Sequence, residues 1–106
     1  MSKSPTWIDA GPAAALADGQ TRSLLVGRRA VALARSGDEY FAVEDVCTHD
    51  GAELTGGGIE GGQIICPRHG ARFCLRTGEA MTPPAYEPIR VFAVKIDAGH
   101  LWVRAD

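Results

Sequence analysis

Cysteine, histidine, aromatic side chains and long apolar runs are all scarce in this chain, and each shortage excludes a class of protein. Only three of the 106 residues are cysteine, which is too few for the disulfide framework of a small secreted domain. The alanine-rich run at 13–17 is far shorter than the roughly 20 apolar residues that span a bilayer. We therefore expect a cytoplasmic protein that does not cross a membrane.

The chain also lacks an excess of charge of either sign. It has 11 Lys and Arg against 13 Asp and Glu, a formal net charge of −2, and no long run of like charge. Binding to nucleic acid depends on a basic surface that neutralises phosphates, so we expect no nucleic-acid partner. A chain of 106 residues fits one domain with a modest core, and we expect a monomer.

Most of the cysteine and histidine in the chain lies in two short segments, 47–49 and 66–69. The four residues are Cys47, His49, Cys66 and His69. Gly51 follows the first segment and Gly70 the second, and more glycines occur at 56–58. Glycine allows the positive φ angles with which a backbone wraps around a compact object. The pattern therefore predicts two loops that each offer one thiolate and one imidazole to a metal site.

Two kinds of metal centre suit this set of donors. Two cysteines and two histidines can hold a tetrahedral structural Zn²⁺, although zinc fingers place both cysteines on one segment and both histidines on the other. Here each segment carries one of each. Such mixed pairs favour a binuclear [2Fe-2S] centre in which the cysteines hold one iron and the histidines the other. Zinc is kept as the alternative.

The two segments resemble the cluster-binding boxes of Rieske ferredoxins. CTHDGAEL at 47–54 and CPRHGARFCLRTGEA at 66–80 look like these boxes, with sixteen residues between the C-x-H and C-x-x-H motifs. Nearly the whole chain fits the length and order of that family. The resemblance implies one [2Fe-2S] cluster per chain, with Cys47 and Cys66 on the buried iron and His49 and His69 on the outer one.

The resemblance and the strand pattern together predict an all-β fold. We expect an antiparallel β-sandwich of the Rieske type over residues 1–106, with a small cluster-binding subdomain inserted at about 45–86. The first strand is expected to stop at Gly11-Pro12, and 13–17 to form one helical turn. Because 89–96 is apolar on both alternating faces, it is expected to be a central strand. The other expected strands are 6–9, 23–26, 30–34, 40–43, a hairpin around 60–63, 72–75 and 100–104.

Departures from the respiratory members of the family indicate a lower reduction potential. Those members carry a serine and a tyrosine where this chain has Ala71 and Phe73, and a disulfide between the positions of Ala52 and Arg68. Hydrogen bonds to the sulfur atoms tune a cluster, and these four residues offer neither hydroxyl nor thiol. The resemblance therefore implies the low-potential branch of soluble ferredoxins that supply oxygenases.

Taken together, these features predict a soluble one-electron carrier and not an enzyme. The resemblance implies that its partners are a flavoprotein ferredoxin reductase and a terminal oxygenase such as a ring-hydroxylating dioxygenase, both bound transiently. The alternative is a small Rieske-like subunit of an enzyme complex such as nitrite reductase. An oxygenase would need a further iron held by two histidines and a carboxylate, and only His100 follows the second segment. Cys74 is expected to be a small buried residue of a strand.

Overall fold

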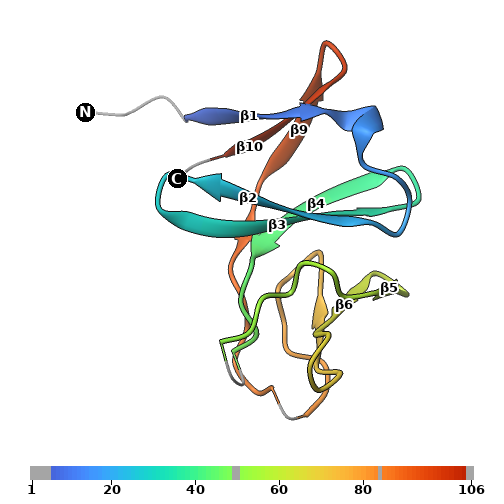
Figure 1. The fold of residues 1–106 in the computed structure, drawn as a ribbon, viewed down its shortest axis with the longest axis vertical. Helices are drawn as coiled ribbons and strands as arrows, with labels where there is room; N and C mark the ends of the chain where they lie inside the picture. The colour runs from blue at the N-terminus through green and yellow to red at the C-terminus, as the bar shows by residue number, and fades with distance from the viewer. Residues whose placement is uncertain (1–5, 49–50, 84, 105–106) are drawn as a thin grey trace.

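Three small antiparallel sheets make up the structure, a computed structural model that describes residues 6–48, 51–83 and 85–104 (Figure 1). The only helical element in these ranges is a 3₁₀ turn, η1, at Ala13–Ala15, where the sequence predicts one helical turn. The strands are β1 Trp7–Pro12, β2 Thr21–Val26, β3 Arg29–Ser36, β4 Glu39–Glu44, β5 Ile59–Glu60, β6 Gln63–Ile65, β7 Arg72–Cys74, β8 Val91–Phe92, β9 Val94–Asp97 and β10 His100–Arg104. The predicted all-β antiparallel class is confirmed.

Two of the three sheets lie together, and the third lies apart from them. One has the strand order β1-β10-β9 and the second has the order β2-β3-β4-β8. These two sheets lie together in the upper part of Figure 1, and the third, β5-β6-β7, lies below them. The chain reaches the third sheet after β4 and leaves it before β8. The first two sheets therefore form a base from which the segment between β4 and β8 projects.

Two tight hairpins build the second sheet. Val26 pairs with Arg29 at the end of β2, and Ser36 pairs with Glu39 at the end of β3, which leaves two residues in each turn. Gly27 and Gly37 open these turns with φ angles of 65° and 62°, the positive values that two-residue hairpin turns require. The glycine signals predicted both hairpins, and the strands extend slightly further than expected.

The expected central strand at 89–96 is wrong, because this segment crosses from one sheet to another. β8 pairs with β4 at the edge of the second sheet, and β9 pairs with β10 at the edge of the first. Between them, the Ala93 carbonyl accepts the N–H of Arg104 at 2.9 Å. Val91 and Phe92 pack into different hydrophobic clusters. Both faces of the segment are therefore apolar without either strand being central.

The first strand continues through Pro12, although a stop at Gly11-Pro12 was expected. The register of β1 against β10 shifts between Asp9 and Pro12, where Gly11 takes a φ of 94°. β1 is an edge strand, and an edge accepts proline because one side of the strand forms no ladder hydrogen bonds. The strand therefore continues through Gly11 and Pro12 by means of a β-bulge.

The described residues contain two hydrophobic clusters, one on each face of the second sheet. One lies between the first two sheets and includes Val31, Leu33, Phe92, Leu101 and Val103. The other joins the second sheet to the segment between β4 and β8, and includes Ala32, Val43, Leu54, Phe73 and the two cysteines Cys47 and Cys66. The predicted metal-binding thiols therefore belong to a core that packs against the base.

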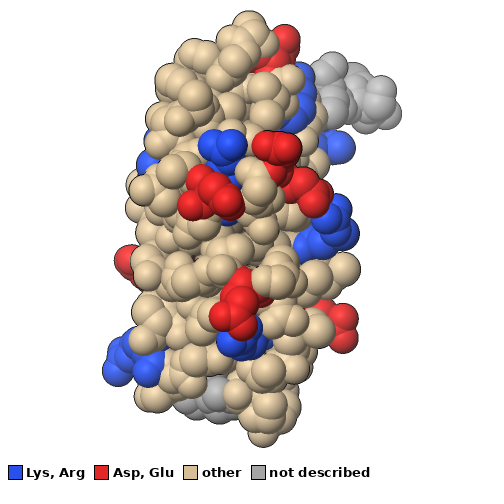
Figure 2. Space-filling model, turned by 90° about the vertical axis from the view of Figure 1, so that its right-hand side faces the viewer, with Lys and Arg blue, Asp and Glu red and all other residues tan. Residues whose placement is uncertain are grey.

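Arg76 makes a polar contact between the base and the segment that joins β4 to β8. Its guanidinium lies 2.7 Å from a carboxylate oxygen of Glu39 at the start of β4 and 5.5 Å from the centre of the Phe41 ring. Both charged side chains are more than half exposed, so the pair contributes little free energy on its own. On the face shown in Figure 2, basic and acidic side chains are interspersed.

Asp9 and His100 join β1 to β10 by a pH-dependent contact. The His100 Nδ1 lies 2.9 Å from a carboxylate oxygen of Asp9, which also accepts the Gly11 N–H at 2.8 Å. The hydrogen bond from His100, followed by that from Gly11, holds the pKa of Asp9 below its usual range. A lowered folded-state pKa stabilises the fold above the unfolded pKa, and this contribution is lost as the pH falls through the folded pKa.

We expect this pKa to depend on the histidine. In an NMR titration of the side-chain carboxyl, H100A should move the pKa of Asp9 upward, towards that of an ordinary aspartate, because the largest cause of its lowering is removed. H100Q, whose amide can still donate a hydrogen bond, is the matched control and should move it less. An Asp9 pKa that is the same in all three proteins would contradict this assignment.

Candidate metal centre

The first ligand loop, residues 47–52, begins three residues after β4 ends. The Cys47 N–H donates to the Ala52 carbonyl at 2.7 Å, and the Gly51 N–H donates to the Cys47 carbonyl at 2.7 Å. Gly51 has a φ of 78°, a conformation that side chains with a Cβ rarely adopt. Two backbone hydrogen bonds on one cysteine thus close a six-residue loop.

The second ligand loop, residues 66–71, repeats this geometry between β6 and β7. The Cys66 N–H donates to the Ala71 carbonyl at 2.7 Å, and the Gly70 N–H donates to the Cys66 carbonyl at 3.0 Å. Gly70 has a φ of 75°. Each loop therefore starts on its cysteine, turns on a glycine four residues later and closes on an alanine five residues later.

The described members of the predicted ligand set are two buried thiols and an exposed imidazole. Cys47 and Cys66 are each about 1% exposed and belong to one hydrophobic cluster, and all three cysteines of the chain are thiols, not disulfides. His69 is exposed. His49 lies outside the described residues. This division agrees with a cluster whose cysteine-bound iron is inside and whose histidine-bound iron is outside.

The structure brings the two cysteine loops into one core but leaves the full ligand set as a prediction. No group of three or more His, Cys, Asp and Glu side chains within 6–48, 51–83 and 85–104 forms a metal site by itself. The donors still fit a mixed cluster, because two thiols at equivalent loop positions and an imidazole from the second loop are the ligand types of a Rieske centre.

The segment after β7 is hydrogen-bonded to both ligand loops or to the residues next to them. Near the second loop, the Arg72 N–H donates to the Thr82 hydroxyl at 3.1 Å, and the Met81 N–H donates to the Arg72 carbonyl at 2.8 Å. At the first loop, the Thr48 hydroxyl donates to the Glu87 carbonyl at 2.7 Å. These contacts place the segment after β7 next to both loops.

Thr48 makes a hydrogen bond that the sequence did not reveal, because its partner, the Glu87 carbonyl, is 39 residues away. We expect T48V to lower the free energy of unfolding of the metal-free chain by about 1 kcal/mol, the usual net contribution of one hydrogen bond. T48S keeps the hydroxyl and is the matched control. Urea titration measures both. An unchanged free energy of unfolding in T48V would show that this hydrogen bond does not contribute.

Neither loop contains the hydroxyls or thiols that the respiratory relatives carry. Ala71 and Phe73 are fully buried, so a serine and a tyrosine at these positions would have brought hydroxyls into the core around the second loop. Ala52 is partly buried and closes the first loop through its carbonyl. With alanine at 52 and arginine at 68, no disulfide can form between these two positions.

Cys74 lies in β7, outside both ligand loops, and is half-buried. It was expected to be buried, and this part of the prediction is wrong because β7 is an edge strand of its sheet. A hydrogen bond from the Thr77 side chain, with smaller ones from the Thr77 and Arg76 backbone, lowers the pKa of its thiol. The third cysteine is thus a residue of the strand and not of either ligand loop.

The structure thus combines an all-β base with a pair of equivalent cysteine loops. The chain belongs to the Rieske [2Fe-2S] domain family, whose sequence profile matches residues 6–93. The cofactor of this family is the [2Fe-2S] cluster that the donor set predicted. No helix in the described ranges is long and apolar enough to cross a bilayer.

Two curated relatives are ferredoxins of oxygenase systems. The chain is 35% identical over 101 residues to the ferredoxin CarAc of Metapseudomonas resinovorans, covering 94% of each chain. It is 33% identical over 97 residues to the anthranilate 1,2-dioxygenase ferredoxin subunit of Burkholderia cepacia, covering 92% of this chain and 90% of that one.

Solved structures show the same fold. The ferredoxin in a complex of reduced oxygenase and oxidized ferredoxin of carbazole 1,9a-dioxygenase matches with a TM-score of 0.88, 35% identity and 94% of each chain covered. The carbazole 1,9a-dioxygenase ferredoxin from Nocardioides aromaticivorans IC177 matches with a TM-score of 0.88 and 28% identity, covering 95% of this chain and 97% of that one. The predicted Rieske ferredoxin resemblance is confirmed.

Proposed function

We propose that this chain is a low-potential one-electron carrier that takes electrons from a flavoprotein ferredoxin reductase and delivers them to a terminal oxygenase. The observation that carries this function is the pair of equivalent loops with buried thiols and an exposed His69, in a chain 35% and 33% identical to ferredoxins of dioxygenase systems. A bound [2Fe-2S] cluster supplies reversible one-electron chemistry. The chain itself is a donor to catalysis and not the catalyst.

Of the four proposed ligands, the two cysteines hold the cofactor in the core and the two histidines face the partner. Cys47 and Cys66 keep the inner side of the site inside the core, where water is excluded. His69 on the second loop is exposed, so a partner can approach its imidazole directly, and His49 is assigned the same role on the first loop. Replacing two thiolates by neutral imidazoles removes negative charge, which raises the potential above that of plant-type ferredoxins.

The proposed partners bind transiently. Electron-transfer complexes bury less than about 1,200 Å² in total, which suits a small cytoplasmic monomer that visits two proteins in turn. A relative with 35% identity was solved in complex with the oxygenase of carbazole 1,9a-dioxygenase, which supports an oxygenase as acceptor. The small subunit of an NADH-dependent nitrite reductase from Mycobacterium tuberculosis shares the fold at 24% identity, so that alternative rests on the fold alone.

The test is the metal content and spectrum of the purified chain. We expect a brown protein with two irons per chain, a visible spectrum of a mixed histidine and cysteine cluster, and a rhombic EPR signal after reduction with dithionite. The chain should run as a monomer and accept electrons from a ferredoxin reductase. A colourless protein that contains stoichiometric zinc, even after anaerobic reconstitution with iron and sulfide, would contradict the proposal and favour a structural zinc module.

A further inference from the structure

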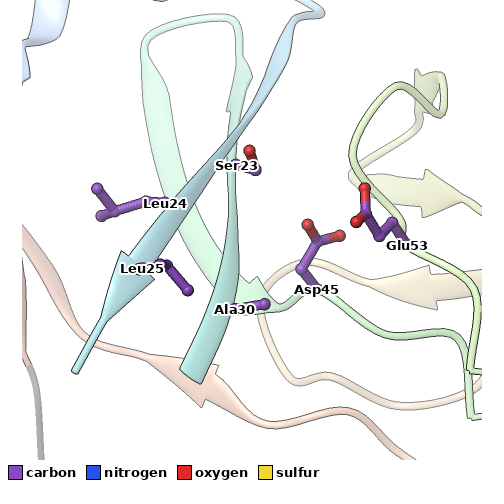
Figure 3. Close-up of a pocket in the computed structure, with 6 residues that line it drawn as sticks. All are labelled: Ser23, Leu24, Leu25, Ala30, Asp45 and Glu53. Carbon is purple, nitrogen blue, oxygen red and sulfur yellow. The ribbon is translucent and has the colours of Figure 1, made fainter. Parts of the chain in front are cut away.

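Asp45 is a buried charged side chain next to the first ligand loop. It is 5% exposed and is the buried polar residue of the described ranges, and it precedes Cys47 by two positions. Figure 3 shows its carboxylate pointing from the end of β4 towards the loop that carries Glu53. Burying a carboxylate is costly unless it is well hydrogen-bonded, so its partners are informative.

Within the described part of the chain, the hydrogen bonds to this carboxylate come from residues just after the first loop. One oxygen accepts the N–H groups of Leu54 at 2.7 Å and Thr55 at 2.8 Å, and the other accepts the Thr55 hydroxyl at 2.7 Å. Since each partner is a donor, the side chain acts as an acceptor only, which is the behaviour of the ionised form. Asp45 thus presents a negative charge inside the protein.

Together with two further hydrogen bonds, these contacts tie the first ligand loop to the base. The Asp45 N–H donates to the Ala30 carbonyl of β3 at 3.0 Å, so the residue is fixed to the second sheet through its backbone. The Gly56 N–H donates to the Thr21 hydroxyl of β2 at 2.7 Å. The N–H groups of residues 54, 55 and 56 therefore donate to the side chains of Asp45, just after β4, and of Thr21 in β2.

We propose that Asp45 is a positioning residue that holds the first ligand loop against the base and, through its buried charge, lowers the reduction potential of the site. The inference rests on the proposed cluster function. Its two parts have different physical origins, because loop position depends on the hydrogen bonds and the potential depends on the charge. Substitutions that keep one and remove the other can separate them.

The sign of the charge effect follows from electrostatics. An added electron makes the cluster more negative, and a nearby negative charge that is shielded from water opposes this addition. Removing the charge therefore raises the potential. Glu53 lines the same open groove as Asp45, with Leu25 and Ala30 on the opposite side (Figure 3). Its exposed carboxylate is surrounded by water and screened, which makes it the matched control for charge without burial.

The experiment compares D45N, which keeps an acceptor for the Leu54 and Thr55 N–H groups, with E53Q, which removes an equal charge from the exposed position. We expect D45N to hold a full complement of iron and to make reduction about threefold to tenfold more favourable, an upward shift of about 30 to 60 mV for a one-electron couple. E53Q should shift the potential by less than half as much. Protein-film voltammetry measures both variants.

A second pair of variants tests the positioning part. T55V removes one hydrogen bond and keeps the charge, so we expect faster loss of iron to a chelator at an unchanged potential. D45A removes the charge and all three hydrogen bonds and should lose iron fastest. In the metal-free chain, D45A should also speed amide hydrogen exchange at Leu54 and Thr55, whereas E53Q should not. This readout stands even if the natural metal were zinc, so failure of the proposed function would be distinguishable.

Each outcome decides one part of the proposal. A D45N potential that moves no further than that of E53Q overturns the charge effect. A D45N chain that folds but holds no cluster also overturns it, since the asparagine preserves the acceptor and the charge would then be needed for binding. Unchanged amide exchange at Leu54 and Thr55 in D45A overturns the positioning role.

Discussion

Replacing Cys66 with serine is expected to abolish iron binding, which is the largest effect that any single change in this chain should produce. Cys66 is about 1% exposed and starts the second ligand loop, with its N–H on the Ala71 carbonyl. A serine fits the same space and preserves these backbone hydrogen bonds, but its hydroxyl cannot act as the thiolate ligand that iron–sulfur clusters use. The loop should remain and the ligand should be lost.

The matched control is the same substitution at Cys74. That residue lies in β7, outside both loops, and we expect C74S to keep its full iron and sulfide content. Both proteins would be purified anaerobically and assayed for iron, sulfide and visible absorption, with circular dichroism as the check that they are folded. Full iron in C66S would remove Cys66 from the ligand set, and loss of iron in C74S would show that the third thiol belongs to the site.

The second large effect is expected from G57A, because the backbone leaves no space for a side chain there. A Cβ on Gly57 would lie 1.9 Å from the Ile65 carbonyl oxygen, 3.0 Å from its carbon and 3.1 Å from the Leu54 carbonyl oxygen. These are backbone atoms, so relief would require moving the chain. The Ile65 N–H donates to the Gly58 carbonyl at 2.9 Å, and that hydrogen bond would be disturbed. We expect a loss of at least about 2 kcal/mol in the free energy of unfolding.

The neighbouring glycine provides the control. A Cβ on Gly58 would approach nothing closer than the tip of the Ile65 side chain at 3.9 Å. Because alanine restricts the unfolded chain more than glycine does, G58A should be neutral or stabilise the protein by up to about 1 kcal/mol. Urea unfolding of the metal-free chain measures both variants. Similar losses in G57A and G58A would mean that the close approach of Gly57 to Ile65 is not what limits this position.

Local signals in the sequence were sufficient wherever one segment determines its own conformation. Gly27 and Gly37 predicted two hairpins because a two-residue turn needs a positive φ within those two residues. The segment 89–96 shows where this reasoning fails. Its apolar pattern records that both faces are covered, but not that β8 and β9 belong to different sheets. That depends on the pairing of β8 with β4, which is far away in the sequence, while β9 pairs with the neighbouring β10.

The candidate site divides in the same way. Thiols and imidazoles are chemically distinctive, so Cys47, His49, Cys66 and His69 could be selected from the printed sequence, and the ligand role of these four residues stays a prediction. Thr48 and Asp45 could not be selected, because their partners are ordinary backbone groups at Glu87, Leu54 and Thr55. An acidic residue just before a cysteine box was the only local signal for Asp45.

The crossing of residues 91–97 between two sheets has a consequence for how the base unfolds. β8 is held by β4 and β9 by β10, with only Ala93 between them. Neither sheet can separate from its neighbour without pulling on a strand that the other sheet still holds. Because both sheets share this segment, the two sheets of the base are mechanically coupled. The base should therefore melt as one cooperative unit, and its two sheets should exchange their most protected amide protons with the same free energy of opening.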